Sequence, residues 1–293
     1  MSTEHGQTAQ RVPREAAAAP GPMVPDVYRI GRRHRETADT WTIELEPADG
    51  SRPPSFEPGQ FNMVYAFGIG EVPISISGDP ASSGPLVHTV RAVGAVTEAI
   101  CGSHSGASLG VRGPYGSSWP VSEAEGGDLV VIAGGLGLAP LRPALLAGLA
   151  SRSSFHRVVL LYGGREPEQL LFRHELERWR EDPAVEMAVT VDTAGGGWSG
   201  DVGVVTKLID RAGLDPARSL ALLCGPEAMM RFAIRSLRGI GLAAEDMLFS
   251  IERNMKCALT QCGRCQFGPT FACREGAVLR LSHVEPFYDL REV

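Results

Sequence analysis

The hydrophobic pattern of the chain changes near residue 120, and this change constrains the fold more than any other feature. From Val27 to about Trp119, short alternating segments such as TWTIELEP and LVHTVRAVG are separated by Gly and Pro. Such closely spaced strands predict an antiparallel barrel. Beyond it, buried-type strands such as DLVVIAGG and RVVLLYGG alternate with helical stretches, which is typical of parallel βαβ units. The predicted fold class is an all-β antiparallel barrel followed by an α/β parallel-sheet domain.

Four segments follow from this pattern. Residues 1–24 are rich in Ala, Pro, Gln and Arg without hydrophobic periodicity, which predicts a flexible tail. The barrel is expected over 25–122 and the α/β domain over 123–246. The last segment, 247–293, begins with the strand DMLFSIERNM and carries a cysteine-rich loop.

Charge and hydropathy exclude several classes of partner. The formal net charge of −6 argues against a nucleic acid or an anionic membrane surface. The start MSTEHGQTAQ has no apolar core, so no secretory signal is expected. The longest apolar run, Leu129 to Leu141, is too short and too rich in glycine for a spanning helix. We therefore expect a cytoplasmic protein without direct membrane insertion.

Four of the six cysteines lie in one short stretch, KCALTQCGRCQFGPTFACREG, with the spacing C-x4-C-x2-C-x7-C. Thiols stay reduced in the cytosol, so the cluster favours metal ligands or redox groups over disulfides. The first part of the spacing is that of plant-type [2Fe–2S] proteins, and Gly263 and Gly268 allow backbone amides to approach cluster sulfurs. A structural zinc site is the alternative, but it more often has two C-x2-C pairs. The predicted ligands are Cys257, Cys262, Cys265 and Cys273.

A glycine-rich turn joins the first βαβ strand to its helix in VVIAGGLGLAP. Free amides at a helix N-terminus without obstructing side chains suit a pyrophosphate. The G-G-x-G spacing is not the G-x-G-x-x-G fingerprint, so taken alone the turn could be purely structural. The residues concerned are Gly134, Gly135, Gly137, Ala139 and Pro140.

Two later strands end in comparable turns. LLCGPEAMM brings Cys224, Gly225 and Pro226 to the sheet edge where α/β proteins bind ligands, although a buried core cysteine is the plain alternative. YGGREP presents Arg165, which either meets a ribose or phosphate or is an ordinary solvated arginine.

Two barrel segments, EVPISIS and GAVT, could offer backbone and hydroxyl groups to a flat ring and its phosphate, but by composition alone they are ordinary strands and turns. Cys101 has no neighbouring thiol and is expected in the core. The histidines show no paired spacing, so none is given a role.

The order of barrel, α/β domain and cysteine loop resembles the ferredoxin–NADP reductase superfamily. Within it, the chain from Val27 to Gly276 is similar to the gamma (diaphorase) subunits of cytosolic NAD(P)-linked nickel–iron hydrogenases, the sulfhydrogenases. The electron-transfer subunits of dihydroorotate dehydrogenases and of anaerobic sulfite reductases share this plan. The short gap from Cys265 to Cys273 favours the hydrogenase or sulfite-reductase type.

The resemblance implies three cofactors: FAD, NAD(P) and a [2Fe–2S] cluster. The residues it assigns to FAD are Val72, Pro73, Ile74, Ser75, Arg91, Gly94, Val96 and Thr97. Those assigned to the dinucleotide are the residues of the glycine turn, Arg165 and the Cys224 to Pro226 turn, and the four cysteines are the cluster ligands. One departure stands out, since many members have Arg and an aromatic residue where this chain has Val72 and Ile74.

The resemblance implies a subunit that moves hydride between NAD(P)(H) and FAD and single electrons through the cluster to or from hydrogenase-type iron–sulfur and catalytic subunits. The alternatives are the sulfite reductase or dihydroorotate dehydrogenase complexes, a stand-alone reductase that serves an oxygenase, or a non-catalytic redox sensor. Only about 45 residues follow the last βαβ element, too few for a separate ferredoxin domain, which favours a subunit. The sequence predicts no preference between NAD and NADP.

Overall fold

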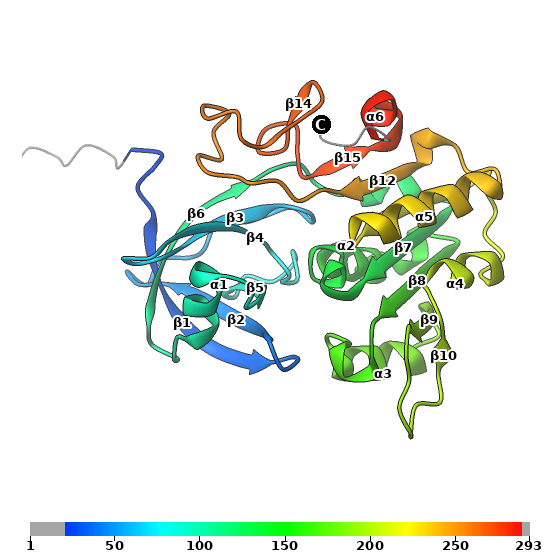
Figure 1. Ribbon diagram of the computed structural model, residues 1–293, viewed down its shortest axis with the longest axis horizontal. Coiled ribbons are helices and arrows are strands. Elements are labelled where there is room, and N and C mark those ends of the chain that lie inside the picture. Colours follow the sequence, from blue (N-terminus) through cyan, green and yellow to red (C-terminus); the bar gives the residue numbers. More distant parts are fainter. Residues whose placement is uncertain (1–20, 289–293) are drawn as a thin grey trace, which may run out of the picture.

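The computed structural model describes residues 21–288, so most of the tail predicted over 1–24 lies outside the described residues. The first half of the described chain is a six-stranded antiparallel sheet with the order β4-β3-β6-β1-β2-β5 (Figure 1). An isolated bridge between Ile76 and His88 joins its two edges and closes the barrel. The strands are β1 (Asp26–Arg35), β2 (Thr40–Pro47), β3 (Phe61–Ala66), β4 (Gly70–Ser75), β5 (Leu86–Arg91) and β6 (Ser108–Tyr115).

Alternating side chains fill the barrel. In β1, Tyr28 and Ile30 point into the core while Val27 and Arg29 are exposed, as the two-residue period of a strand requires. The helix α1 (Ala95–Gly102) lies over the barrel and buries Ile100 against the same core as Val64. The barrel predicted from the short alternating segments is confirmed.

The second half contains a seven-stranded sheet with the order β10-β9-β8-β7-β11-β12-β15. All neighbouring strands are parallel except β15, which runs antiparallel to β12. The parallel sheet predicted from the βαβ pattern is therefore also confirmed. The strands are β7 (Asp128–Gly134), β8 (Arg157–Gly164), β9 (Glu186–Val191), β10 (Asp201–Val202), β11 (Ser219–Cys224), β12 (Met247–Ser250) and β15 (Val278–Arg280).

Helices cover both faces of this sheet. Leu129 and Val131 of β7 face one core, while Val130 and Ile132 face the other, so the strand is buried on both sides. The first core is covered by α2 (Leu138–Ala150) and α3 (Arg173–Glu181). The second is covered by α4 (Thr206–Arg211), α5 (Glu227–Gly239) and α6 (Leu281–Tyr288).

The four clustered cysteines lie in an excursion between two adjacent strands of the second sheet. The chain leaves β12, runs through residues 251–277 and returns as β15 (Figure 1). This cysteine loop contains only the two-residue strands β13 (Gln266–Phe267) and β14 (Thr270–Phe271). The segment predicted over 247–293 thus includes two strands of the sheet as well as the loop.

One apolar core continues through all three parts. Phe61 and Met63 of the barrel share a cluster with Phe249 of the sheet and with Cys265 and Cys273 of the loop. Within residues 21–288, no helix combines the length and the apolar composition needed to cross a bilayer.

Candidate functional site

The two glycine turns predicted for the dinucleotide lie against each other. Gly134 ends β7, and Gly225 follows β11, which is its neighbour in the sheet. A Cβ on Gly137 would lie 2.2 Å from the carbonyl oxygen of Cys224. A Cβ on Gly225 would lie 3.0 Å from the Cα of Gly134. Only glycine permits this close packing of backbone on backbone.

At Gly135 the backbone conformation, rather than close packing, requires glycine. Its φ of +53° lies in the left-handed region, and a Cβ there would meet no heavy atom within 4 Å. Ala139 and Pro140 follow in the first turn of α2. The Leu138 amide donates to the Gly135 and Leu136 carbonyls and Pro140 has no N–H, so it is the open space at Gly135, rather than a full set of free amides, that suits a phosphate.

Tyr162, which sequence reasoning missed, holds the backbone of this turn through hydrogen bonds of its hydroxyl. Its hydroxyl donates to the Gly135 carbonyl at 3.1 Å and accepts from the Leu171 amide at 3.1 Å. Burial raises the pKa of this phenol well above its ordinary value, so it remains a neutral donor. A tyrosine within an apolar strand gives no sequence signal for such a role.

The Cys224 thiol is buried at the end of β11. Burial raises its pKa to about 12, and the nearby Glu252 carboxylate acts in the same direction. Hydrogen bonds with Ser250 and the Gly225 backbone lower it less. The side chain is therefore a neutral thiol at the edge where both glycine turns meet.

Arg165 lies immediately after β8, which pairs with β7 in the sheet, and its side chain is exposed. Its carbonyl accepts from the Thr193 amide at 3.0 Å, so the backbone at this strand end is fixed while the side chain extends into solvent.

The residues predicted for FAD are brought together on one side of the barrel. Val72 and Ile74 of β4 are half-buried and pack on the barrel core together with Val96 of α1. A Cβ on Gly70 would lie 3.1 Å from Cγ2 of Val96, so β4 and the start of α1 are in contact. The structure thus places the two segments side by side, although one strand separates them in the sequence.

Arg91 and Thr97 are engaged within the barrel. The Arg91 Nε pairs with Oδ2 of Asp39 at 2.8 Å, and both side chains are about half exposed. The Thr97 hydroxyl accepts from the amides of Val93 and Gly94 and donates to the Gly94 carbonyl. Thr97 therefore stabilises the turn that begins α1, and its hydroxyl is already engaged within that turn.

A buried histidine, His88 of β5, is hydrogen-bonded to the end of β4. His88 Nδ1 donates to the Ser75 carbonyl at 3.0 Å, and Nε2 accepts from Asn62 Nδ2 at 3.1 Å. Burial lowers the pKa of His88 to about 4, so the ring is neutral near pH 7. Sequence reasoning assigned no role to any histidine, and this one positions the strand predicted to line the flavin.

Side chains missed by sequence reasoning join the two halves directly beside these segments. Arg142, two residues after Pro140, donates to the carbonyl of Ser77 at the end of the flavin segment. A bidentate pair with Glu175, at 2.6 Å for each contact, holds the Arg142 guanidinium. The predicted flavin strand and the predicted dinucleotide turn therefore lie across one interface.

The four cysteines of the loop converge in two pairs. The Sγ atoms of Cys265 and Cys273 lie 3.2 Å apart, and the Cys257 and Cys262 side chains interact with each other. All four thiols are free, and only Cys262 is exposed. Within residues 21–288, no three His, Cys, Asp or Glu side chains are arranged to hold a single metal ion.

The loop backbone turns its amides toward these sulfurs. Leu259 N donates to Cys257 Sγ and Thr260 N to Cys273 Sγ, each at 3.3 Å. Ala258 and Thr260 adopt positive φ values of 58° and 60°, which non-glycine residues seldom do. Hydrogen bonds from the Arg264 and Cys257 backbone lower the pKa of Cys262 to about 7, while burial raises that of Cys273 to about 11.

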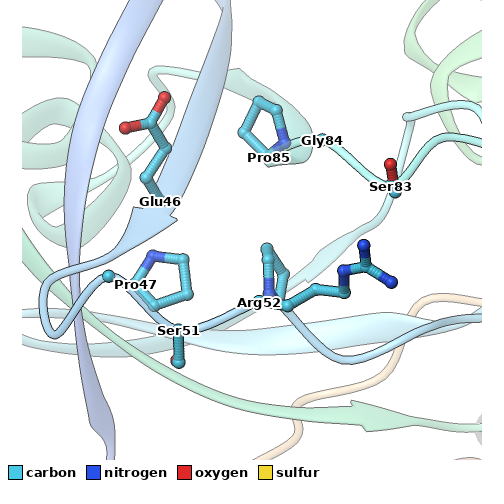
Figure 2. A pocket seen from close by; sticks show the side chains of 9 residues that line it. Glu46, Pro47, Ser51, Arg52, Ser83, Gly84 and Pro85 are labelled. Carbon is cyan, nitrogen blue, oxygen red and sulfur yellow. The ribbon is translucent and has the colours of Figure 1, made fainter.

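A cavity of about 350 Å³ lies elsewhere on the barrel, between the end of β2 and the loop that precedes β5. Figure 2 shows Glu46 and Arg52 at this cavity, which Pro47 and Pro85 also line. None of the residues predicted for a cofactor lines it, so it is separate from the sites described above.

Several known proteins are similar to this chain. Residues 131–235 match the family model of the oxidoreductase NAD-binding domain. The gamma subunit of sulfhydrogenase 2 from Pyrococcus furiosus is 36% identical over 240 residues, covering 76% of this chain and 83% of that protein. The chain belongs to the sulfhydrogenase gamma-subunit family. A probable dihydroorotate dehydrogenase B electron transfer subunit from Methanocella arvoryzae is 37% identical over 224 residues, covering 76% of this chain and 78% of its own.

The fold extends to more distant structures. The NADH-dependent reduced ferredoxin–NADP oxidoreductase studied for flavin-based electron bifurcation aligns with a TM-score of 0.70 at 22% identity, covering 90% of this chain and 94% of its own. A ferredoxin NADP⁺ reductase from Neisseria gonorrhoeae, with bound FAD and NADP, aligns at 0.65 and 20% identity over 76% and 96% of the two chains. The sulfhydrogenase-type chain thus has the ferredoxin-reductase fold.

Proposed function

We propose that the chain is the electron-transfer subunit of a hetero-oligomeric nickel–iron hydrogenase, linking NAD(P)(H) to the iron–sulfur subunits of that complex. The observation that carries this proposal is the convergence of four free thiols in a loop that shares a core with both the barrel and the sheet. The similarity to the sulfhydrogenase gamma subunits supports the choice of complex.

The cysteine loop suits a [2Fe–2S] cluster better than a single zinc ion. A [2Fe–2S] cluster takes four thiolates, two on each iron. The thiols lie in two pairs, and two backbone amides already donate to sulfur, a contact that tunes cluster potentials. A structural zinc site more often has two C-x2-C pairs, and this loop has one.

In this function each part of the chain has a distinct task. FAD and the cluster, when bound, supply the hydride and single-electron chemistry. The turn at Gly135 and the start of α2 would bind the dinucleotide pyrophosphate, and Cys224 would face the nicotinamide as a neutral thiol. The strand from Val72 to Ser75 supports the flavin ring, and α1 receives its pyrophosphate. Cys262, the exposed cysteine, marks the side of the loop that faces the partner.

The first test is the cofactor content of the chain purified after expression with iron and sulfide. We expect one FAD, two irons and two acid-labile sulfides per chain, and bleaching of the flavin by NAD(P)H. Stoichiometric zinc without sulfide would contradict the cluster, bound FMN would contradict FAD, and a flavin that NAD(P)H leaves oxidised would support the sensor.

A second candidate is the electron-transfer subunit of a dihydroorotate dehydrogenase, favoured by the 37% identity to the Methanocella arvoryzae protein. Co-purification from the native organism separates the two, because hydrogenase subunits and a dihydroorotate dehydrogenase catalytic subunit differ in mass and in activity.

A further inference from the structure

A buried arginine connects the predicted flavin strand to the cysteine loop. Arg112 lies in β6, and its side chain is 2% exposed. The guanidinium forms a bidentate pair with Glu71 of β4, Nε to Oε1 and Nη2 to Oε2, each at 2.7 Å. Glu71 directly precedes Val72, the first residue assigned to FAD.

The remaining nitrogen of the same guanidinium reaches the loop. Arg112 Nη1 donates to the carbonyl of Cys257 at 3.1 Å. It also donates to the Tyr115 hydroxyl at 3.1 Å and to the Pro22 carbonyl at 3.2 Å. One side chain thus bridges the flavin strand and the first of the four cysteines.

A buried ion pair of this kind is poor evidence for stability, since apolar residues of similar size often serve as well. Its distinctive property is geometric. The guanidinium holds five donors in one plane, which fixes the carboxylate on one side and the carbonyl on the other at once. Links at the two ends of the loop, from Ser117 Oγ to the Val278 carbonyl and from Ile251 N to the Ala277 carbonyl, do not involve a cysteine.

We infer that Arg112, with Glu71, is a positioning residue that sets the separation between β4 and Cys257, and hence between the flavin and the cluster. This inference rests on the proposed function. Arg112 touches neither reacting group in this role and acts through Cys257 and β4.

Each NAD(P)H oxidised to NAD(P)⁺ delivers two electrons and one proton as hydride to the flavin. The cluster accepts one electron at a time, so the second transfer requires a one-electron oxidant that empties the cluster. The experiment measures only the first of these transfers, in which one electron passes to the cluster and the other stays on the flavin, so no oxidant is added.

The test is Arg112→Lys in the chain loaded with FAD and cluster. Lysine keeps the charge but cannot bind the carboxylate and the carbonyl with one rigid fork. We expect flavin bleaching by NAD(P)H to stay within about twofold of the wild type and cluster reduction to slow by about tenfold or more, because small misplacements of reacting groups cost large factors in rate. Stopped-flow absorbance measures the first rate and freeze-quench EPR the second.

Arg157→Lys is the matched control. Arg157 also forms a bidentate pair, with Glu186, but at the start of β8, where it further contacts the Ala212 and Gly213 carbonyls and, at 3.5 Å, the Asp128 carboxylate. Its loss should leave both rates unchanged. An equal slowing of cluster reduction in this control would overturn the inference, because the loss of a bidentate arginine pair far from the loop would then have the same effect.

A second measurement needs no electron transfer. Amide hydrogen exchange of Leu259 and Thr260, whose N–H groups face the sulfurs, should rise by about tenfold in Arg112→Lys and remain unchanged in Arg157→Lys. If the wild type holds no cluster, the proposed function fails, and this exchange in the cluster-free chain still decides whether Arg112 holds the loop.

Glu71→Gln is the milder variant if Arg112→Lys does not fold. It removes the charge from the carboxylate while keeping one acceptor oxygen. Cluster reduction should therefore slow, and amide exchange of Leu259 and Thr260 should rise, but each by less than in Arg112→Lys. Wild-type exchange together with wild-type cluster reduction in a folded variant would overturn the inference. Faster exchange with unchanged cluster reduction would overturn it too, because the contact would then be structural only.

Discussion

The glycine turn predicted to bind the dinucleotide and the cysteine loop differ in the contacts that hold them. The turn at Gly134 to Gly137 lies between neighbouring parallel strands, and Tyr162 fixes its backbone from below. The loop over 251–277 has only two two-residue strands and includes two non-glycine residues with positive φ. The first site is formed by the sheet itself. The second, we infer, reaches its full order only when its thiols bind a cluster, as structural metal sites generally do.

The largest expected effect follows from Cys265→Ser, which removes one ligand from the loop. NAD(P)H should still bleach the flavin at the wild-type rate, since the proposed function puts hydride transfer between barrel and sheet, away from the loop. Electron delivery to a hydrogenase-type partner should fall by about 100-fold or more, because a lost thiolate removes or perturbs the cluster. Stopped-flow bleaching and partner reduction measure the two rates.

Cys101→Ser is the control for that substitution. Cys101 is buried in the barrel, where its thiol donates to the Val90 carbonyl at 3.4 Å, far along the chain from the loop. Both rates should match the wild type. Partner reduction at the wild-type rate in Cys265→Ser would mean that electrons leave from the flavin directly.

Gly135→Val tests the glycine turn predicted to bind the dinucleotide. A β-branched residue disfavours φ of +53° and its side chain enters the open space above the turn. We expect KM for NAD(P)H to rise by about 30-fold while FAD stays bound, a loss of about 2 kcal/mol in binding. Gly213→Val is the control, because Gly213 has φ of +55° and equally open surroundings outside the site. Equal kinetics in the two variants would refute the assignment of the turn.

Removal of the cluster by a chelator under anaerobic conditions should affect the cysteine loop and the sheet differently, without any substitution. Amide exchange over residues 257–273 should speed up by about tenfold or more, whereas exchange in β7 and β11 should not change. A uniform rise throughout both regions would show that the loop and the sheet unfold together.

His88 extends the comparison to the strand predicted to line the flavin, and its substitution has the smallest expected effect at neutral pH. Its folded pKa of about 4 lies below the unfolded value of 6.5, so the unfolded chain binds the extra proton between these limits. Stability from this group is complete above pH 6.5 and is lost toward pH 4, at about 1.4 kcal/mol per pH unit. Urea unfolding at pH 7 and pH 5 should show this loss in the wild type and a weaker one in His88→Gln. An identical pH dependence of the free energy of unfolding in both proteins would contradict this role of His88.

Much of this arrangement could be predicted because it follows local rules. The period of two before residue 120 and the strand–helix alternation after it indicate the barrel and the parallel sheet. The turns after β7 and β11 are marked by their glycines. The contacts of Arg112, Arg142 and Tyr162 could not be predicted, since each joins segments far apart in the sequence. Thr97 shows the converse, because its hydroxyl is engaged by its own turn rather than offered to a ligand.

The central claim is that electrons from NAD(P)H pass through the flavin into a cluster held by the cysteine loop. The most direct measurement is EPR of the wild-type chain after anaerobic addition of excess NAD(P)H. The account predicts a bleached flavin and the signal of one reduced [2Fe–2S] cluster per chain, absent before NAD(P)H is added and absent in Cys265→Ser. A bleached flavin without any cluster signal, in a chain that contains its full iron and sulfide, would contradict it.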